Sequence, residues 1–357
     1  MSSSQYAVES SEPGKSLFGE FTAERQAGSW MERQFGEHGL ADIAAAVRSR
    51  TPLTISQADL LTRAPVPLVL RLAEQSPTHV IEDLLRPVRF IPLAALLSEN
   101  GSTRALEECS ASIENALEQT PEKSSLHIAI DSWSFTGGRH PVSYDAVLQT
   151  LAALRERFAP RVLLIGPSTG ELKSLIPESD SELNDASNVL RAFRDAGIER
   201  IEGGNDLKIH ASAVASGLQT TFAHNLVRSR MRRGDDAPRP ECRSFLEELF
   251  ELRTKLFPAY IPETWYPWSS VVLDHGQPKQ EAPLGFEVLF AIALARLCLP
   301  EVQFIRAPLS MIGPRMAEVA LQFGANDLGY AAVDADTADQ LGLVRWQIAV
   351  HELQYRK

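Results

Sequence analysis

The sequence predicts an α/β fold with the element count of a (β/α)8 barrel. Eight short runs are rich in β-branched and apolar residues, which is typical of β-strands. Longer segments with helical periodicity lie between most of these runs. Eight strands joined by mostly helical connections form the pattern of a parallel barrel with its helices outside. A doubly wound open sheet is the structural alternative.

The chain before the first run is predicted to consist of a tail and a group of helices. Residues 1–17 are rich in Ser and Glu and are expected to be a disordered tail. Residues 18–85 are expected to form an N-terminal helical extension, and residues 86–357 the barrel. In the extension, the i, i+3, i+4, i+7 spacing of a buried helix face is made by Leu40, Ile43, Ala44 and Val47. The N-cap candidates for the next helix are Thr54 and Ser56.

The predicted barrel strands follow in chain order. They are residues 88–93, 126–131, 161–166, 199–203, 219–224, 259–263, 302–307 and 326–333. The clearest helical segments between them are residues 143–158, 181–197, 242–257, 287–299 and 314–324. Two of these segments end in glycine, at Gly197 and Gly324, which is a common helix stop.

Composition excludes several classes of protein. Of 357 residues, 35 are Lys or Arg and 46 are Asp or Glu, so the net charge is −11. An acidic balance argues against broad contact with nucleic acid or anionic lipid, because both need positive fields. No apolar run is long enough to span a membrane, and the first residues lack the apolar stretch of a signal peptide. We therefore expect a cytoplasmic protein.

Polar side chains gather where the predicted strands end, which is where barrels place their chemistry. The acid/base candidates are Glu202, His224, Glu263 and Asp327. The substrate-binding candidates are Asp131, Gly137, Gly138, Arg139, His140, Ser168, Thr169, Asn205, Arg306, Ser310 and Asn326. If the strand register is right, all of Asp131, Glu202, His224, Glu263 and Arg306 point into one mouth.

Several candidates have a structural alternative. The glycine pairs at 137–138 and 203–204 either turn the chain or bring backbone N–H groups close to an anionic ligand. Ser168 and Thr169 suit the cap of the following helix. His224 suits acid/base chemistry or a structural role, and His210, inside a helical segment, suits a structural role.

Arg306 ends an apolar run, so its charge is expected at the barrel mouth. A guanidinium held there needs an acidic partner, Glu263 or Asp327, or an anionic group of the substrate. Arg306 is therefore a ligand-binding candidate, and a purely structural ion pair is the alternative.

Signatures of metal sites and nucleophiles are weak. The chain has no CxxC, HExxH or P-loop motif. An oxygen and nitrogen site from Glu202, His224 and Glu263 is conceivable but not favoured, so no metal is predicted. The three cysteines are far apart in helical segments and are expected to act as small hydrophobic residues: Cys109, Cys242 and Cys298.

Residues 292–329, ending in FGANDLG, resemble the closing segment of the radical S-adenosylmethionine (SAM) enzymes of the futalosine menaquinone route. That group comprises aminofutalosine synthase, the dehypoxanthine futalosine cyclase and the related deazaflavin-forming synthases. The similarity extends upstream to RAFRDAGIERIEGG at 191–204, GGRHP at 137–141 and the helical segment 41–61. It covers roughly residues 38–345 and implies a radical-SAM-type barrel.

The sequence departs from this family where the family's cofactor binds. Family members have a CxxxCxxC loop directly after the first strand, and it holds a [4Fe–4S] cluster. Here the corresponding residues 90–109 contain only Cys109. We therefore expect no cluster and no adenosyl-radical chemistry, and keep S-adenosylmethionine as a candidate ligand. Residues 132–136 separate the second strand from its glycines, and Leu207 stands where the family has glutamate.

Two functional hypotheses follow. The first is a non-radical enzyme that uses the acids and Arg306 on a small polar or anionic metabolite of a biosynthetic pathway. The second is a non-catalytic partner subunit of a cluster-bearing radical SAM enzyme, or a homodimer. Its distinguishing feature would be an exposed apolar surface, for which residues 265–273 are the candidate. The aromatic residues of this segment are equally suited to closing the pocket.

Overall fold

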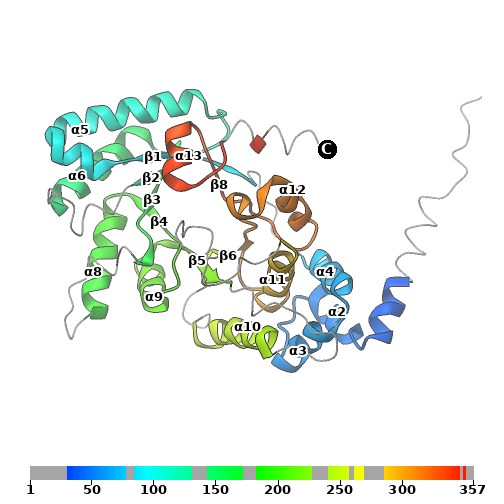
Figure 1. Cartoon of the computed structure of the whole chain (residues 1–357). Helices are drawn as coiled ribbons and strands as arrows, with labels where there is room; N and C mark the ends of the chain where they lie inside the picture. The colour runs from blue at the N-terminus through cyan, green and yellow to red at the C-terminus, as the bar shows by residue number, and fades with distance from the viewer. Residues whose placement is uncertain are drawn as a thin grey trace, which may run out of the picture.

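The structure, a computed structural model, describes residues 30–77, 84–130, 143–170, 172, 182–226, 240–256, 261–268, 285–345 and 349–350. Within these ranges the chain forms a curled parallel sheet with helices on its outside, preceded by N-terminal helices (Figure 1). This confirms the predicted barrel-type α/β fold. The expected tail at 1–17 lies outside the described residues.

The N-terminal helices form as their sequence predicts. They are α2 (Ala41–Arg48), α3 (Ile55–Arg63) and α4 (Val66–Gln75). The predicted apolar stripe of α2 is buried. Thr54 is the N-cap of α3, where its hydroxyl accepts the Gln57 N–H and the Gln57 side chain bonds back to the Thr54 N–H.

Eight parallel strands form the sheet, in the spatial order β7-β6-β5-β4-β3-β2-β1-β8. They are β1 (Arg86–Ile91), β2 (Leu126–Ile130), β3 (Val162–Gly166), β4 (Ile198–Glu202), β5 (Gln219–Asn225), β6 (Thr264–Trp268), β7 (Phe304–Ile305) and β8 (Tyr330–Ala332). The two end strands are β7 and β8. Arg306, directly after β7, forms a parallel β-bridge with Asp327, which precedes β8. There the Ala307 N–H donates to the Asp327 carbonyl oxygen at 2.8 Å. The sheet therefore curls around an interior.

Two strands differ from the prediction in a way that matters for the site. The sixth strand was expected at 259–263, but β6 begins at Thr264, because Trp265 fills the core outside the sheet and fixes the strand there. The eighth was expected from Asn326, but β8 begins at Tyr330. Residues expected at the ends of these two strands therefore precede them.

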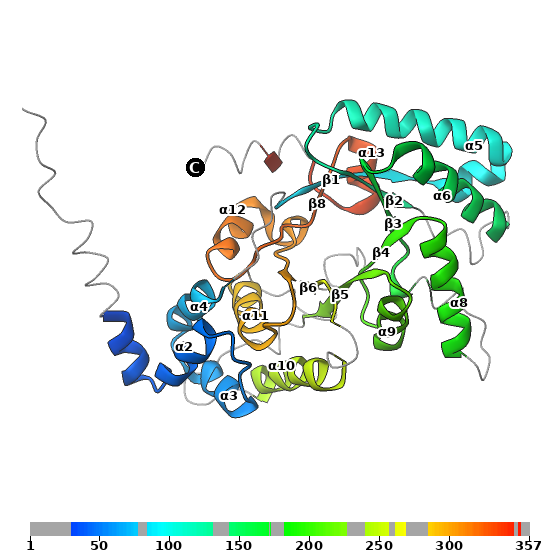
Figure 2. The same cartoon turned by 180° about the vertical axis from the view of Figure 1, so that it is seen from behind.

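The helices follow the outside of the curled sheet (Figure 2). They are α5 (Leu93–Glu118), α6 (Tyr144–Phe158), α8 (Glu182–Asp195), α9 (Leu207–Ala215), α10 (Pro240–Glu251) with a π-helical turn η3 (Leu252–Leu256), α11 (Gly285–Cys298), α12 (Leu309–Leu321) and α13 (Ala335–Leu341). None of the helices in the described ranges combines the length and apolar character needed to cross a membrane.

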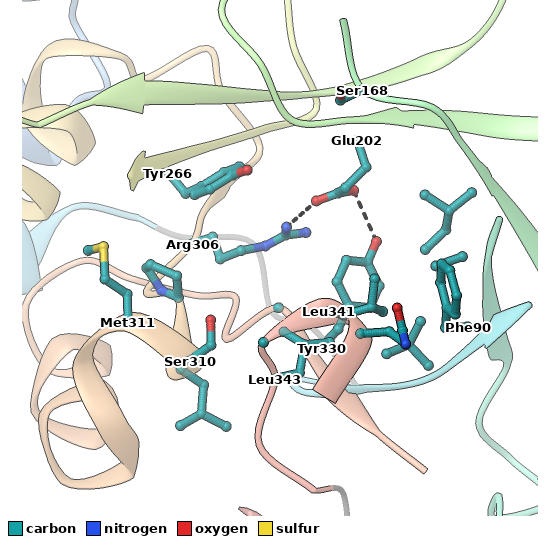
Figure 3. Close-up of a pocket in the computed structure, with 18 of the residues that line it drawn as sticks. Phe90, Ser168, Glu202, Tyr266, Arg306, Ser310, Met311, Tyr330, Leu341 and Leu343 are labelled. Carbon is teal, nitrogen blue, oxygen red and sulfur yellow. Dashed lines mark hydrogen bonds and ion pairs between the residues drawn. The ribbon is translucent and has the colours of Figure 1, made fainter. Parts of the chain in front are cut away.

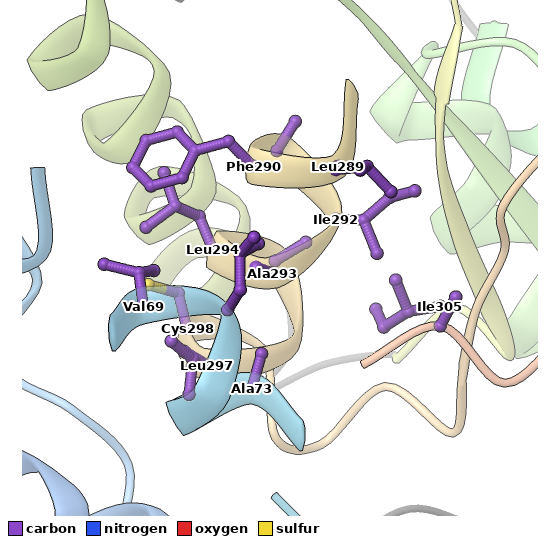
Figure 4. Close-up of a cluster of buried hydrophobic side chains, with 14 of the residues drawn as sticks. Val69, Ala73, Leu289, Phe290, Ile292, Ala293, Leu294, Leu297, Cys298 and Ile305 are labelled. Carbon is purple, nitrogen blue, oxygen red and sulfur yellow. The ribbon is translucent and has the colours of Figure 1, made fainter. Parts of the chain in front are cut away.

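Two hydrophobic cores lie outside the sheet. One packs α5, α6, α8 and α9 against β1 to β4. The other joins the N-terminal helices to α10, α11 and α12. Helix α11 is at its centre, because every residue from Glu287 to Cys298 is buried (Figure 4).

Candidate functional site

Alternate residues of each strand face the interior of the curled sheet. On β4, Arg200 and Glu202 make polar contacts there, whereas Ile201 between them packs in the core outside. On β7 and the residue after it, Ile305 packs outside and Arg306 faces the interior. The interior therefore collects charged side chains from several strands.

Arg306 lies between two carboxylates. Its Nε donates to Asp327 at 2.9 Å, and its Nη1 donates to Glu202. Arg86, at the start of β1, donates from Nη1 to both oxygens of Asp327, at 3.1 and 3.2 Å. The Gly329 N–H gives Asp327 a further hydrogen bond at 2.7 Å. The prediction that Arg306 pairs with Asp327 is confirmed.

Two tyrosines enclose this ion-pair network. The Arg306 guanidinium lies over the rings of Tyr266 and Tyr330, with its Cζ 5.4 and 5.0 Å from the ring centroids. The Tyr330 hydroxyl donates to Glu202 at 3.2 Å and accepts from Nη1 of Arg200 at 3.1 Å. Figure 3 shows Glu202, Arg306 and the two rings around one space.

The acids of the network are ionised. Burial alone would raise the pKa of Asp327, but the charges of Arg306 and Arg86 outweigh it and lower this pKa from 3.8 to about 2. Burial also acts to raise the pKa of Glu202, and Arg306 and Arg200 lower it below 4.5. Both carboxylates therefore act as fixed hydrogen-bond acceptors and not as proton donors near neutral pH.

Two tyrosines and one histidine of the interior are neutral. Burial raises the pKa of Tyr266 and of Tyr330 above 10, so both are phenols. His127 packs edge-on against Tyr330, with 5.2 Å between ring centroids. Burial and the nearby arginines lower the pKa of His127 well below 6.5, so its imidazole carries no charge.

A pocket of about 530 Å³ opens on this network (Figure 3). Its polar lining comes from Ser168, Glu202, Tyr266, Arg306, Ser310, Tyr330 and Gln340. Its apolar lining comes from β1 to β3, from the start of α12 and from the end of α13 with the residues after it. It includes Val88, Phe90, Ile165, Leu309, Met311, Leu341 and Leu343. The pocket thus combines apolar walls with a few fixed polar groups, as small-molecule sites do.

The loops after β3 and β4 are packed tightly against each other. Gly203 and Gly204 turn the chain with φ angles of 76° and 83°. A Cβ on Gly203 would lie 3.0 Å from the Tyr266 hydroxyl, and one on Gly204 would lie 1.9 Å from Oγ1 of Thr169. The Gly203 N–H donates to the Thr221 carbonyl oxygen at 3.0 Å. Turning and close packing therefore account for this glycine pair.

Gly204→Ala is expected to lower the free energy of unfolding by about 1–3 kcal/mol, because the methyl group overlaps Thr169 and the backbone is left-handed. Chemical denaturation measures the loss. The matched control is Gly342→Ala, where φ is 61° but a Cβ would meet nothing within 4 Å. Equal losses in the two variants would contradict the importance of the Thr169 contact.

The structure brings four of the predicted site residues to the pocket: Ser168, Glu202, Arg306 and Ser310. Thr169 is buried behind Gly204, and Asn205 is exposed after β4, so neither lines it. Five predicted residues lie outside the described ranges, and their roles stay predictions: Asp131, Gly137, Gly138, Arg139 and His140.

The prediction that His224 faces the pocket is wrong. Its Nε2 lies 3.0 Å from the carboxylate of Glu248 on α10, and its ring packs against Phe245 and Trp265 in the core outside the sheet. The inward positions of β5 are of the opposite parity, as Thr221 shows by donating to Glu202. A one-residue difference in register reverses a side chain's direction.

The expectation that Glu263 and Asp327 stand at strand ends is also wrong. Glu263 precedes β6, and Asp327 precedes β8. Both reach the interior, but Glu263 pairs with Arg200 and Asp327 is fully buried between two arginines. Neither lines the pocket, so neither is placed to exchange protons with a ligand there.

Asn326 joins secondary-structure elements and does not face the pocket. Its Oδ1 accepts from Nη2 of Arg296 on α11 at 2.6 Å and from the Ile305 N–H at 2.9 Å. Its Nδ2 donates to the Gln303 carbonyl oxygen at 3.1 Å. The predicted binding role of Asn326 is therefore not supported by its position.

Sequence reasoning missed four residues of the network: Arg86, Arg200, Tyr266 and Tyr330. One signal was available, because the alternation in IERIE at 198–202 places Arg200 on the same strand face as Glu202. The tyrosines gave no comparable signal: Tyr266 lies outside the predicted sixth strand, and Tyr330 lies within the predicted eighth strand but was assigned no role. His210 has the structural role that was expected, with Nε2 3.1 Å from the Gly204 carbonyl oxygen.

The cysteines that the structure describes are buried. Cys109 on α5 packs in the core beside β1 to β4, and Cys298 on α11 packs in the other core. Burial raises the pKa of each thiol to about 12, so both are protonated. They act as small hydrophobic residues, as expected. The side chain of Cys242 lies outside the described part of the chain.

Comparison with known proteins gives a consistent picture. No family model matches the chain. The cyclic dehypoxanthine futalosine synthase of Streptomyces coelicolor is 25% identical over 229 residues, which are 58% of this chain and 54% of that protein. The chain thus spans about half the length of the curated relative it matches.

Two solved structures share the fold. Methylornithine synthase (PylB) superposes with a TM-score of 0.56 and 12% identity, over 88% of this chain and 96% of its own. HydG, a maturase of the [FeFe]-hydrogenase, gives a TM-score of 0.53 and 10% identity, over 92% and 76%. The resemblance to the radical SAM enzymes of the futalosine route is therefore confirmed, and with it the fold.

Proposed function

We propose that this radical-SAM-fold protein works without an iron–sulfur cluster, as a non-radical enzyme that acts on a small metabolite. The observation that carries the proposal is the start of α5. This helix begins at Leu93, two residues after β1 ends, in the stretch where the resembled family has its cluster loop.

The residues in that stretch do not fit a [4Fe–4S] cluster. A cluster needs three thiolates close together, whereas residues 90–109 contain one cysteine. That cysteine, Cys109, is a protonated thiol buried in the outer core, as is Cys298 in the other core. Among the described residues no group of three His, Cys, Asp or Glu side chains could hold a metal ion. We derive no radical step.

The pocket residues support binding and orientation of a metabolite. Glu202 presents an ionised carboxylate that Arg306 and Tyr330 hold in place. Tyr266 presents a neutral phenol beside it. Because these groups are fixed by the interior network before a ligand binds, they stabilise charge without reorganising. The reaction classes that fit are proton transfer, elimination, cyclisation and group transfer.

Anaerobic reconstitution with iron and sulfide tests the proposal. We expect no stoichiometric retention of either element, and no visible absorbance of a cluster. The control is the Cys109→Ala, Cys242→Ala, Cys298→Ala triple variant, which should retain the same adventitious iron as the wild type. About four irons per wild-type chain, absent from the variant, would overturn the proposal.

One observation favours a second candidate function, a non-catalytic partner of a cluster-bearing relative. The interior acids Glu202, Glu263 and Asp327 are all paired with arginines, which leaves few groups for proton transfer. Of the expected docking surface at 265–273, Trp265 is fully buried and Tyr266 faces the pocket, while residues 269–273 lie outside the described part of the chain. Turnover of a pocket ligand, or of S-adenosylmethionine, by the purified chain alone separates the two functions.

A further inference from the structure

We propose that the pocket takes a small apolar or aromatic amine, with its nitrogen on Glu202 and its apolar part against Phe90 and Leu343. This rests on the proposed function, because it names the ligand class of the same site. It replaces the expectation that Arg306 recruits an anion.

Of the two charged side chains that line the pocket in the described part of the chain, Glu202 and Arg306, the carboxylate is the more exposed. The side chain of Arg306 is 5% exposed, while that of Glu202 is 20% exposed. Two of the three guanidinium nitrogens of Arg306 are already bonded to carboxylates. An anionic ligand would therefore meet Glu202 before it reached the arginine behind it.

Glu202 keeps capacity to accept a further hydrogen bond. Its Oε2 accepts from the hydroxyls of Thr221, at 3.0 Å, and Tyr330, at 3.2 Å. Its Oε1 accepts from Arg306. A carboxylate offers about four lone-pair positions, so Oε1 has one left for a ligand. An N–H donor fills it, whereas a carboxylate or phosphate oxygen does not.

Tyr266 supports the same choice. Among the described residues its hydroxyl has no hydrogen-bond partner, although it lines the pocket close to Gly203. A neutral phenol can accept one N–H while its own proton is donated elsewhere. A primary amine carries enough N–H groups for both Glu202 and Tyr266.

The opposite side of the pocket fits an apolar group. Phe90 comes from β1, Leu341 is the last residue of α13, and Leu343 follows it (Figure 3). Ile165 of β3 also lines the pocket. The volume of about 530 Å³ is within the usual range of small-molecule sites, roughly 300–1,000 Å³. A flat ring with a short amine side chain matches this division.

Three probes of nearly equal size test the proposal by ligand-observed NMR titration at neutral pH: 2-phenylethylamine, 2-phenylethanol and phenylacetate. We expect the amine to bind wild-type protein at least about tenfold more tightly than the carboxylate, corresponding to ~1.4 kcal/mol. The alcohol should fall between them. Equal or tighter binding of phenylacetate, or no binding by any probe, overturns the proposal.

Two variants assign the preference to Glu202. Glu202→Gln should lose most of the preference for the amine. Asp339→Asn makes the same change in net charge at an exposed residue of α13 that does not line the pocket, and should keep it. A preference that survives in Glu202→Gln overturns the assignment. The wild-type series carries the test even if this variant folds poorly.

The outcome is independent of the cluster assay. Retained iron and sulfide would refute the non-radical function without changing the order of the three probes. A reversed order would refute the amine while leaving the chain without a cluster. The two failures are therefore distinguishable.

Discussion

Replacing Arg306 with methionine is expected to lower the free energy of unfolding by about 3–5 kcal/mol. Methionine keeps an unbranched apolar stem, but it leaves the carboxylates of Asp327 and Glu202 buried without the guanidinium that now bonds both. Arg306→Lys keeps the charge but loses the planar guanidinium that reaches two acids. Its free energy of unfolding should therefore lie between those of the wild type and Arg306→Met. Urea denaturation followed by circular dichroism measures the losses.

The control is Arg157→Met. Arg157 also pairs with an acid, Glu114, but both side chains are 53% exposed. An exposed ion pair contributes no more than about 1 kcal/mol. Similar losses at positions 157 and 306 would contradict the view that burial makes the inner pair sensitive.

Lowering the pH should reduce the difference in free energy of unfolding between the wild type and Arg306→Met. In the wild type the pKa of Asp327 is about 2 instead of 3.8, so its contribution to stability is complete above 3.8 and is lost as the pH falls towards 2. In the variant the pKa values of Asp327 and Glu202 rise because their partner is gone. A carboxyl group whose pKa is higher in the folded than in the unfolded protein stabilises the folded protein as the pH falls. A difference that stays constant with pH would contradict this account.

The architecture was readable from the sequence because strand and helix periodicities are local. The buried face of α2 and the capping box at Thr54 follow from residue spacing alone. The position of β6 does not, since it depends on Trp265 filling a space between α10 and α11 that belongs to distant parts of the chain. Tertiary packing decided that strand, as it often does.

Pocket residues were harder to predict, because a residue lines the pocket only if it lies on the inner face of its strand and at the right position along it. Glu202 and Arg306 were found because Glu202 ends β4 and Arg306 directly follows β7, both on the inner side. His224 ends a strand as well, but on the outer side, and periodicity alone does not show which side is inner. Glu263 and Asp327 are inward but precede their strands. Three of the four acid/base candidates therefore lie outside the pocket, one on the outer face of its strand and two before their strands.

The core outside β5 to β7 also joins parts of the chain that the sequence suggested as separate. Val69 and Ala73 of α4 lie beside α11, with Leu294, Leu297 and Cys298 in the same cluster (Figure 4). One continuous cluster of buried apolar side chains contains residues of both the N-terminal helices and this side of the barrel. We therefore expect the two to unfold together, although the division at residues 85 and 86 remains a prediction.

Leu294→Ala is expected to lower the free energy of unfolding by about 2–5 kcal/mol, because it leaves a cavity in this shared core. Leu294 is fully buried, on the helix where every neighbour is buried too. The matched control, Leu60→Ala on α3, removes the same atoms from a side chain that is 42% exposed, and should cost no more than about 0.5 kcal/mol.

The shape of the unfolding transition distinguishes a shared core from two independent units. If the core is continuous, Leu294→Ala moves a single transition, and tryptophan fluorescence and circular dichroism report the same midpoint. If the N-terminal helices were an independent unit, the loss at α11 would split the curve, since α4 would retain its own structure after the barrel unfolds. Helix α4 buries six of its ten residues, including Val69 and Leu72, in the core that contains α11. Unfolding of the barrel would therefore remove α11 from the apolar surface on which α4 packs, and a split transition would contradict the shared core.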